Sequence, residues 1–239
     1  MPVMLIHGAL GSGEQLRPLA ERIGPFDPIL VELSGHGRKP IPPEGLSYAR
    51  FLEDIAEAME GHERVHLFGY SMGGYAAMLF AARYPERVAS VCTLGSKLIW
   101  DEAGLQALLK RLDTDALAKH VPAYAERLAK EHGADRWREL VKATGELVTR
   151  DFHAPLLQPE VFAQVTCPVL VCSGDRDDMT LAKDTLEAAA RFPKAGALIL
   201  PQTKHPFDFV DLDLFVPFLR KLWTSAVPGS VKYGFSARP

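Results

Sequence analysis

Residues 69–73 form the stretch Gly-Tyr-Ser-Met-Gly, in which Ser71 stands between two glycines directly after the apolar run 65–68. A serine at a sharp turn from a strand into a helix has a strained backbone, and its neighbours two positions away must be small. Glycine meets that demand. The apolar, Ala-rich segment 74–84 has helical spacing and ends at Pro85, so the required context is present. We interpret Ser71 as a nucleophile; outside this context the same five residues would suit an ordinary turn equally well.

A serine hydroxyl needs a base that takes its proton and an acid that orients the base. Candidates for both follow apolar runs late in the chain. The segment 174–178, Gly-Asp-Arg-Asp-Asp, comes directly after the run 168–172, and His205 follows the run 197–200. Because parallel strands end on one edge of their sheet, we expect Ser71, an aspartate of this cluster and His205 to converge there.

The elements that must position these side chains alternate along the chain. Apolar runs predict strands at 3–6, 29–33, 65–68, 88–94, 168–172 and 197–200, and helical periodicity predicts helices at 14–23, 47–59, 74–84, 181–191 and 210–223. This alternation predicts an α/β fold with a doubly wound, mainly parallel sheet of about six strands.

The alternation stops between about residues 100 and 157, where the chain is charged, helical in spacing and without a strand pattern. We interpret this part as an inserted helical cap. The expected organisation is a first part of the core at 1–97, the cap at 98–163, a second part of the core at 164–225, and a tail of turn composition at 226–239.

Composition excludes several classes of function. The chain has 239 residues, 47% of them hydrophobic and 24% charged, with a formal net charge of −3. Such a composition is typical of a soluble globular protein, and the small net charge with interspersed signs does not indicate binding to nucleic acid or to an anionic membrane surface. Three cysteines cannot all pair within the chain, and no leader or membrane span is apparent. We expect a cytoplasmic protein, monomeric or homodimeric, that acts on a small molecule without a cofactor or metal.

The motifs together resemble those of a small, cap-bearing α/β hydrolase, and the resemblance covers nearly the whole chain. They are His7-Gly8 after the first strand, Leu33-Ser34-Gly35-His36-Gly37 after the second, Gly-Tyr-Ser-Met-Gly-Gly, then Gly-x-x-Asp and a late histidine. Ser, Asp, His is also the order of that superfamily's triad. The resemblance implies that Asp177, three residues after Gly174, is the acid. Asp175 and Asp178 remain alternatives for the acid; their structural interpretations are a turn former for Asp175 and a helix cap near Thr180 for Asp178.

An oxyanion that develops during acyl transfer must be met by preorganised N–H donors. One is expected from Met72, the residue after the nucleophile, at a helix N-terminus. The resemblance implies that the second comes from Ala9, just after the His-Gly pair. We expect His7 to bond its loop and His36 to stabilise a turn, so that neither carries protons in the reaction.

The chain departs from the family pattern in three places. Its His-Gly strand begins at residue 3, so we expect six parallel strands and not eight. His205 lies in Lys204-His205-Pro206, where many relatives have Gly-His, which implies a differently shaped loop. Lys97 stands after the strand 88–94, where some families place an alternative acid.

The cap is expected to roof the substrate pocket. Leu10, Tyr70, Lys97, Leu98 and Trp100 are the residues expected near it. Lys97 would pair either with a substrate carboxylate or, equally well, with Asp101 or another acid of the cap. The histidines of the cap have no spacing that indicates a metal site.

These residues predict a hydrolase of carboxylic esters that forms an acyl-enzyme on Ser71. A second hypothesis is a carbon–carbon lyase or synthase of the same fold, similar to the menaquinone-pathway enzyme that eliminates pyruvate. Relatives of that enzyme usually have arginine where this chain has Tyr75, which disfavours this reading. A third hypothesis, a non-catalytic binding protein on the same scaffold, predicts the loss of a triad residue, and none is lost.

Overall fold

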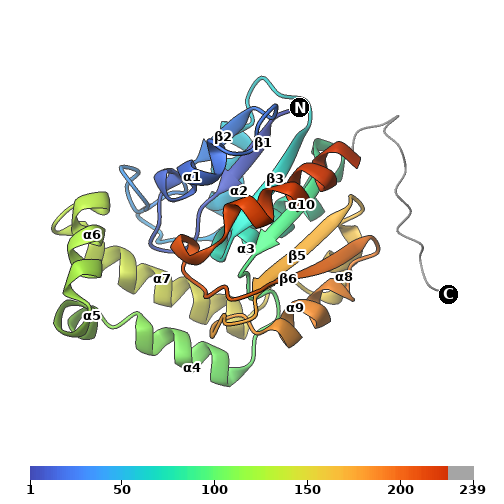
Figure 1. Cartoon of the computed structure of the whole chain (residues 1–239). Helices are drawn as coiled ribbons and strands as arrows, with labels where there is room; N and C mark the ends of the chain where they lie inside the picture. The colour runs from blue at the N-terminus through green and yellow to red at the C-terminus, as the bar shows by residue number, and fades with distance from the viewer. Residues whose placement is uncertain (226–239) are drawn as a thin grey trace.

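A sheet of parallel strands forms the centre of the computed structural model, which describes residues 1–225. The strands are β1 (Val3–Ile6), β2 (Pro28–Val31), β3 (Val65–Tyr70), β4 (Val88–Leu94), β5 (Val169–Gly174) and β6 (Ala195–Leu200). All neighbours pair in parallel, in the order β2-β1-β3-β4-β5-β6 (Figure 1). The predicted six-stranded parallel sheet is confirmed. The predicted tail, 226–239, lies outside the described residues.

Helices cover both faces of the sheet because its strands present apolar side chains on both sides. In β1, Val3 and Leu5 join one core cluster while Met4 and Ile6 join the other. The first cluster is covered by α1 (Arg17–Ala20) and α10 (Leu212–Ser225), and the second by α2 (Tyr48–Ala58), α3 (Met72–Arg83) and α9 (Ala182–Ala189) (Figure 1). This doubly wound arrangement is the one that the alternating pattern predicts.

Several helix boundaries differ from the prediction by one or two residues, and two differences have a clear local cause. The helix expected at 14–23 is a 3-10 turn at Gly13–Leu16 followed by the short α1, because Pro18 has no N–H to bond the carbonyl of Glu14. The last helix begins at Leu212 and not at residue 210, since the side chain of Asp211 accepts the N–H of Leu214 at 3.1 Å and so caps the helix there. The helix expected from residue 47 is capped by Ser47, as its side chain accepts the N–H of Arg50.

Between β4 and β5 the described chain contains only helices. They are α4 (Glu102–Arg111), α5 (Thr114–His120), α6 (Pro122–His132), α7 (Arg136–His153) and α8 (Pro159–Gln164). The longest, α7, buries Trp137, Leu140 and Leu147 in the same cluster as α2 and α3, so it anchors this segment to the sheet. In Figure 1, α4, α5 and α6 lie beyond one end of the sheet and not against either face.

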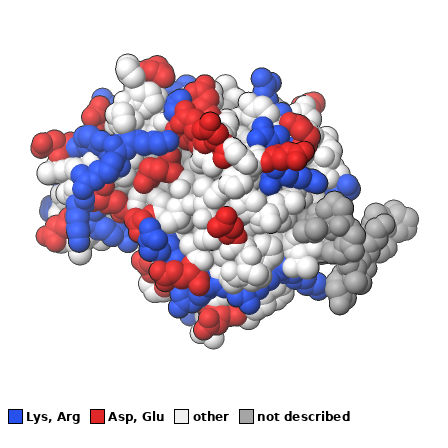
Figure 2. Space-filling model, turned by 90° about the horizontal axis from the view of Figure 1, so that it is seen from above, with Lys and Arg blue, Asp and Glu red and all other residues white. Residues whose placement is uncertain are grey.

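Charged side chains of both signs are interspersed on the face seen in Figure 2, around a mostly uncharged centre. Within residues 1–225, no helix combines the length and the apolar character that crossing a bilayer requires.

Candidate active site

Ser71 occupies the turn between β3 and α3 with φ 52° and ψ −119°. A residue other than glycine with these backbone angles is strained by roughly 1–3 kcal/mol, and the surrounding structure must stabilise it in this conformation. One restraint is the hydrogen bond from the Ser71 N–H to the carbonyl of Leu94 at 2.8 Å. The strained strand-to-helix turn expected from the sequence is therefore present.

The glycines around Ser71 are required by the close approach of neighbouring backbone. A Cβ on Gly69 would lie 2.4 Å from the Cα of Gly74, and a Cβ on Gly73 would lie 2.3 Å from the carbonyl oxygen of Ile6. Both contacts are with backbone, which cannot rotate away. The start of α3 is thus packed against the ends of β1 and β3, and this fixes the position from which Ser71 projects.

Asp177 and His205 form a hydrogen-bonded pair. The Nδ1 of His205 lies 2.9 Å from Oδ2 and 3.1 Å from Oδ1 of Asp177. The side chain of Asp177 is 2% exposed, and its Oδ1 also accepts the N–H groups of Met179 and Thr180 at 2.9 and 2.8 Å. These bonds fix the carboxylate, which in turn orients the imidazole so that Nε2 is the nitrogen left for proton transfer.

The other two aspartates of the cluster have different partners. Asp175 is exposed and accepts the N–H of Thr203 at 3.1 Å. Asp178 accepts two hydrogen bonds from Arg111 of α4, at 2.8 and 3.3 Å, and these bonds lower the pKa of its carboxyl group. The prediction that Asp178 caps a helix is wrong, because Asp177 caps the turn at residues 179–180 instead and α9 has no side-chain cap.

Two residues that the sequence did not single out for this role support the pair. Gly95, directly after β4, has φ 62°, and a Cβ there would lie 3.2 Å from Oδ2 of Asp177 and from the ring of His205. The hydroxyl of Tyr70, a residue expected only to contact substrate, donates to the carbonyl of His205 at 2.8 Å. In the sequence, Gly95 is recognisable only as a glycine directly after an apolar strand. The neighbouring residues do not indicate that Asp177 and His205 lie beside it.

Replacing Gly95 by alanine is expected to lower kcat roughly ten- to hundredfold, because the added methyl displaces the Asp177–His205 pair by a few tenths of an ångström or more. The matched control is Gly61→Ala, since Gly61 also has a positive φ, 80°, but open space around its Cβ position. Both variants should lose about 1 kcal/mol of unfolding free energy to backbone strain. Denaturant titration and steady-state kinetics on both proteins check this, and equal kcat in the two would contradict it.

The two N–H groups expected to bind an oxyanion lie at the same cavity as Ser71. Ala9 and Met72 both line it, and within residues 1–225 neither N–H has a hydrogen-bond partner. Gly8, beside Ala9, is so close to the nucleophile that an added Cβ would lie 3.2 Å from that of Ser71. Met72 is the first residue of α3, where the helix dipole also favours negative charge.

The two histidines near this loop serve its structure, as expected. The Nδ1 of His7 bonds the carbonyl of Gly8 at 2.8 Å, and its Nε2 accepts the N–H of Leu33 at 3.1 Å. His36 bonds the carbonyl of Ser34 through Nδ1 at 3.1 Å. Burial keeps the pKa of His36 well below its ordinary value, so its ring is neutral. No cluster of three metal-binding side chains occurs in the described part of the chain.

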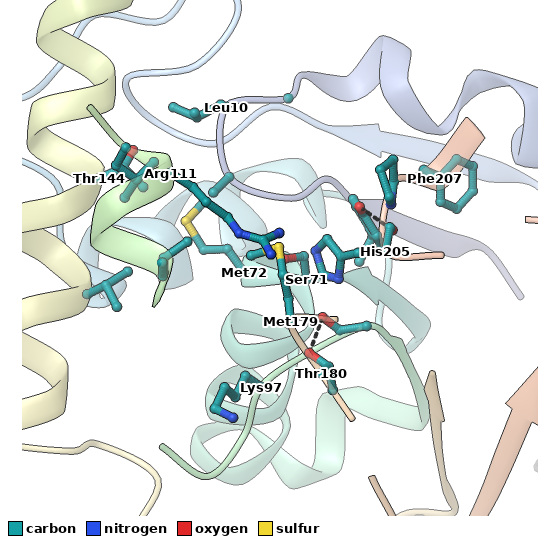
Figure 3. A pocket seen from close by; sticks show the side chains of 18 of the residues that line it. Leu10, Ser71, Met72, Lys97, Arg111, Thr144, Met179, Thr180, His205 and Phe207 are labelled. Atoms are coloured by element: carbon teal, nitrogen blue, oxygen red, sulfur yellow. Dashed lines mark hydrogen bonds between the residues drawn. The ribbon is translucent and has the colours of Figure 1, made fainter. Parts of the chain in front are cut away.

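A cavity of about 1020 Å³ lies over Ser71 and His205. Figure 3 shows these two side chains next to each other, with Arg111 reaching in from α4 and Thr144 from α7. Polar and apolar side chains both line the cavity, so it suits a small organic molecule that carries polar groups better than a purely apolar molecule. The residues expected near the substrate that do line it are Leu10, Tyr70, Lys97 and Trp100, whereas Leu98 is buried and does not.

Lys97 is held by acidic partners. Its Nζ lies 3.1 Å from Asp184 and 3.9 Å from Asp101, and it stands 5.8 Å from the ring centre of Trp100. The structure therefore contains the expected ion pair of Lys97 with Asp101, but the shorter contact of Lys97 is with Asp184 of α9, which belongs to the core and not to the cap. The sequence could not identify Asp184, which is 87 residues away.

Comparison with known proteins agrees with the fold and the motifs. A family model described as alpha/beta hydrolase fold matches residues 1–144. A protein of Bacillus subtilis (strain 168), named as a candidate 2-succinyl-6-hydroxy-2,4-cyclohexadiene-1-carboxylate synthase, is 37% identical over 249 aligned residues that cover 93% of this chain and 90% of that protein. The pimeloyl-(acyl-carrier protein) methyl ester esterase of Chromobacterium violaceum is 27% identical, over 86% of this chain and 87% of its own.

Among solved structures, that of NosK from Streptomyces actuosus is similar with a TM-score of 0.75 and 26% identity, covering 94% of this chain and 98% of that one. The strand order, the turn at Ser71 and the family match over more than half of the sequence agree with one another. The chain belongs to the alpha/beta hydrolase fold family, as an enzyme of that superfamily.

Proposed function

We propose that this enzyme hydrolyses a carboxylic ester, or a related acyl bond, of a small molecule through an acyl-enzyme on Ser71. The observation that carries the proposal is the Asp177–His205 hydrogen bond at the cavity that Ser71 also lines. A buried carboxylate bonded to Nδ1 of an imidazole, beside a serine in a strained turn, is the arrangement that makes a serine hydroxyl nucleophilic.

The reaction follows from these positions. His205 Nε2 takes the proton of the Ser71 hydroxyl while its oxygen attacks the acyl carbon, and Asp177 stabilises the imidazolium that forms. The N–H groups of Ala9 and Met72 bind the oxyanion. The C–O bond to the leaving alcohol then breaks, and the alkoxide takes the proton from His205. Water, deprotonated by His205, then attacks the acyl carbon of the acyl-enzyme. The bond from that carbon to Ser71 Oγ breaks and Oγ takes the proton back from His205, so the products are a carboxylic acid, an alcohol and free enzyme.

The helices between residues 98 and 163 are proposed to act as the cap that selects the substrate. Arg111, Tyr124 and Arg127 of this segment line the cavity, so its shape and charge differ from those of a bare sheet edge. The similarity to a methyl ester esterase over 86% of the chain supports ester cleavage.

The second candidate is a synthase that eliminates pyruvate, and it is favoured by the 37% identity to the Bacillus subtilis protein. Tyr75 argues against it. Relatives of the menaquinone-pathway enzyme usually have arginine at that place, whereas the Tyr75 hydroxyl here accepts the N–H of Leu157 at 3.1 Å and its ring packs 4.6 Å from that of Tyr48. A residue so engaged cannot replace a guanidinium that binds an anionic substrate.

One experiment separates the two candidates. The protein is incubated with a fluorophosphonate probe, and the adduct is mapped by mass spectrometry. Activity on p-nitrophenyl esters of increasing chain length is then compared with pyruvate release from an enolpyruvyl-bearing cyclohexene carboxylate, whose elimination forms the cyclohexadiene. We expect labelling at Ser71 and ester turnover with a chain-length optimum. Pyruvate release with ester turnover at background would favour the synthase, and absence of labelling with no activity in either assay would refute both.

A further inference from the structure

His132, the last residue of α6, is buried in the cap and bonds two loops of the core. The residue is 2% exposed. Nδ1 lies 2.9 Å from the N–H of Gly37, and Nε2 lies 3.0 Å from the carbonyl oxygen of Leu10. A backbone N–H only donates and a carbonyl only accepts. The ring is therefore neutral, with its single proton on Nε2, and it satisfies both loops at once.

The environment of His132 favours this neutral form. Burial is the largest influence on the group and lowers its pKa, with the nearby His7 adding to that effect, while the bond to Leu10 and the carboxylates of Glu131 and Glu32 oppose it. The ring of His36 lies 6.0 Å away. A protonated His132 would place a second N–H against that of Gly37, so only the neutral ring fits the contact.

The loop that His132 holds needs an external restraint. Leu10 has φ 58°, and besides Ser71 and Gln202 it is the only non-glycine residue with a positive φ among residues 1–225. Such a backbone persists only where its surroundings hold it. Leu10 directly follows Ala9, whose N–H is one of the two oxyanion donors under the proposed function. The Leu10 carbonyl and the Ala9 N–H are separated by a single peptide unit, that between Ala9 and Leu10, so a change in the backbone of Leu10 would also shift the Ala9 N–H.

A second contact from the same helix end supports this role. Glu131, next to His132, accepts a hydrogen bond from the hydroxyl of Ser12, which lies in the same loop as Leu10. Two successive residues of α6 thus bond the loop on either side of Gly11. Tyr124 of α6 also lines the cavity. A helix that lines the cavity therefore carries the bonds that shape the loop after Gly8.

We propose that His132 is a positioning residue, which holds the loop after Gly8 so that the Ala9 N–H faces the acyl oxygen bound at Ser71. The inference rests on the proposed function and deepens it, because the oxyanion site is complete only while α6 is docked on the core. Its catalytic contribution comes from the donor to Leu10, whereas the acceptor for Gly37 serves stability.

The two hydrogen bonds can be removed separately. In His132→Gln the amide nitrogen can take the place of Nε2 and still donate to Leu10, whereas in His132→Asn the amide oxygen takes the place of Nδ1 and only the bond to Gly37 remains. Each variant loses one buried bond, so both should lose comparable thermal stability. Their kinetics should differ. We expect His132→Asn to lose ten- to hundredfold in kcat with KM within twofold of wild type, and His132→Gln to lose less than threefold.

A transition-state analogue tests the oxyanion site directly. An aryl trifluoromethyl ketone, which forms a tetrahedral adduct with a serine, should bind His132→Asn more weakly by the same factor as the loss in kcat. The carboxylic acid product, which forms no oxyanion, should bind within twofold. His120→Asn is the control, since His120 is exposed in α5 and does not line the cavity.

Several outcomes would overturn the inference. If the Asn and Gln variants lose kcat equally, or if kcat follows thermal stability alone, His132 has only a structural role. Should neither variant fold, Ser12→Ala removes the second contact, and an unchanged kcat and ketone affinity in it would count against the proposal. If the wild type does not react with fluorophosphonate, the proposed function fails and this inference with it, so the two failures are distinguishable.

Discussion

Ser71→Ala is expected to lower kcat at least about 10⁴-fold while KM stays within a few-fold of wild type. Removing the nucleophile of a serine hydrolase leaves only the contribution of the oxyanion donors and of substrate binding. The fold should persist, because alanine at Ser71 keeps the Cβ and the N–H that bonds Leu94. Steady-state assays with the best p-nitrophenyl ester, at protein concentrations that expose residual turnover, measure the loss.

The control is Ser225→Ala. The hydroxyl of Ser225 donates to the carbonyl of Leu222 at the end of α10, and this residue does not line the cavity. It should keep wild-type kcat and fluorophosphonate labelling. Retention of more than a tenth of the wild-type kcat in Ser71→Ala, or an adduct on another residue, would show that the nucleophile is misassigned.

Asp177→Asn is expected to lower kcat about 10³- to 10⁴-fold without unfolding the protein. The amide can still accept the N–H groups of Met179 and Thr180 through its oxygen. Its NH₂ group would then face Nδ1 of His205, which must accept, so that the ring proton moves to Nε2 and the imidazole can no longer take a proton from serine. The KM should change little because the buried Asp177 does not line the cavity.

Asp175→Asn and Asp178→Asn are the matched controls. Each changes the same chemical group within two residues of Asp177, and each should lose less than about threefold in kcat. The ion pair of Asp178 with Arg111 is exposed on both sides, and such pairs contribute only about 0–1 kcal/mol. A loss in Asp178→Asn or Asp175→Asn as large as that in Asp177→Asn would assign the acid to a different residue.

Local pattern was enough for the sheet and for the turn at Ser71. Every predicted strand is present. The four central strands are apolar runs that are buried on both faces of the sheet, and the two edge strands, β2 and β6, are apolar runs that are only partly buried. The glycines around Ser71 indicate that two segments of backbone approach each other closely there, since any residue with a Cβ would clash. The helix at 14–23 was misjudged where the effect of Pro18 on the hydrogen bond of Glu14 outweighed apolar periodicity.

The sequence by itself determined the architecture, the order of Ser71, the aspartate cluster and His205 along the chain, and their convergence on one edge of the sheet, because strand direction is a property of the alternating pattern. Only the tertiary structure decided which aspartate bonds His205, that Gly95 lies against this pair, and that Lys97 is matched by Asp184. These facts depend on ångström distances between segments tens of residues apart. Local spacing contains no information about such distances, and only the packing of the helices and loops on the sheet sets them.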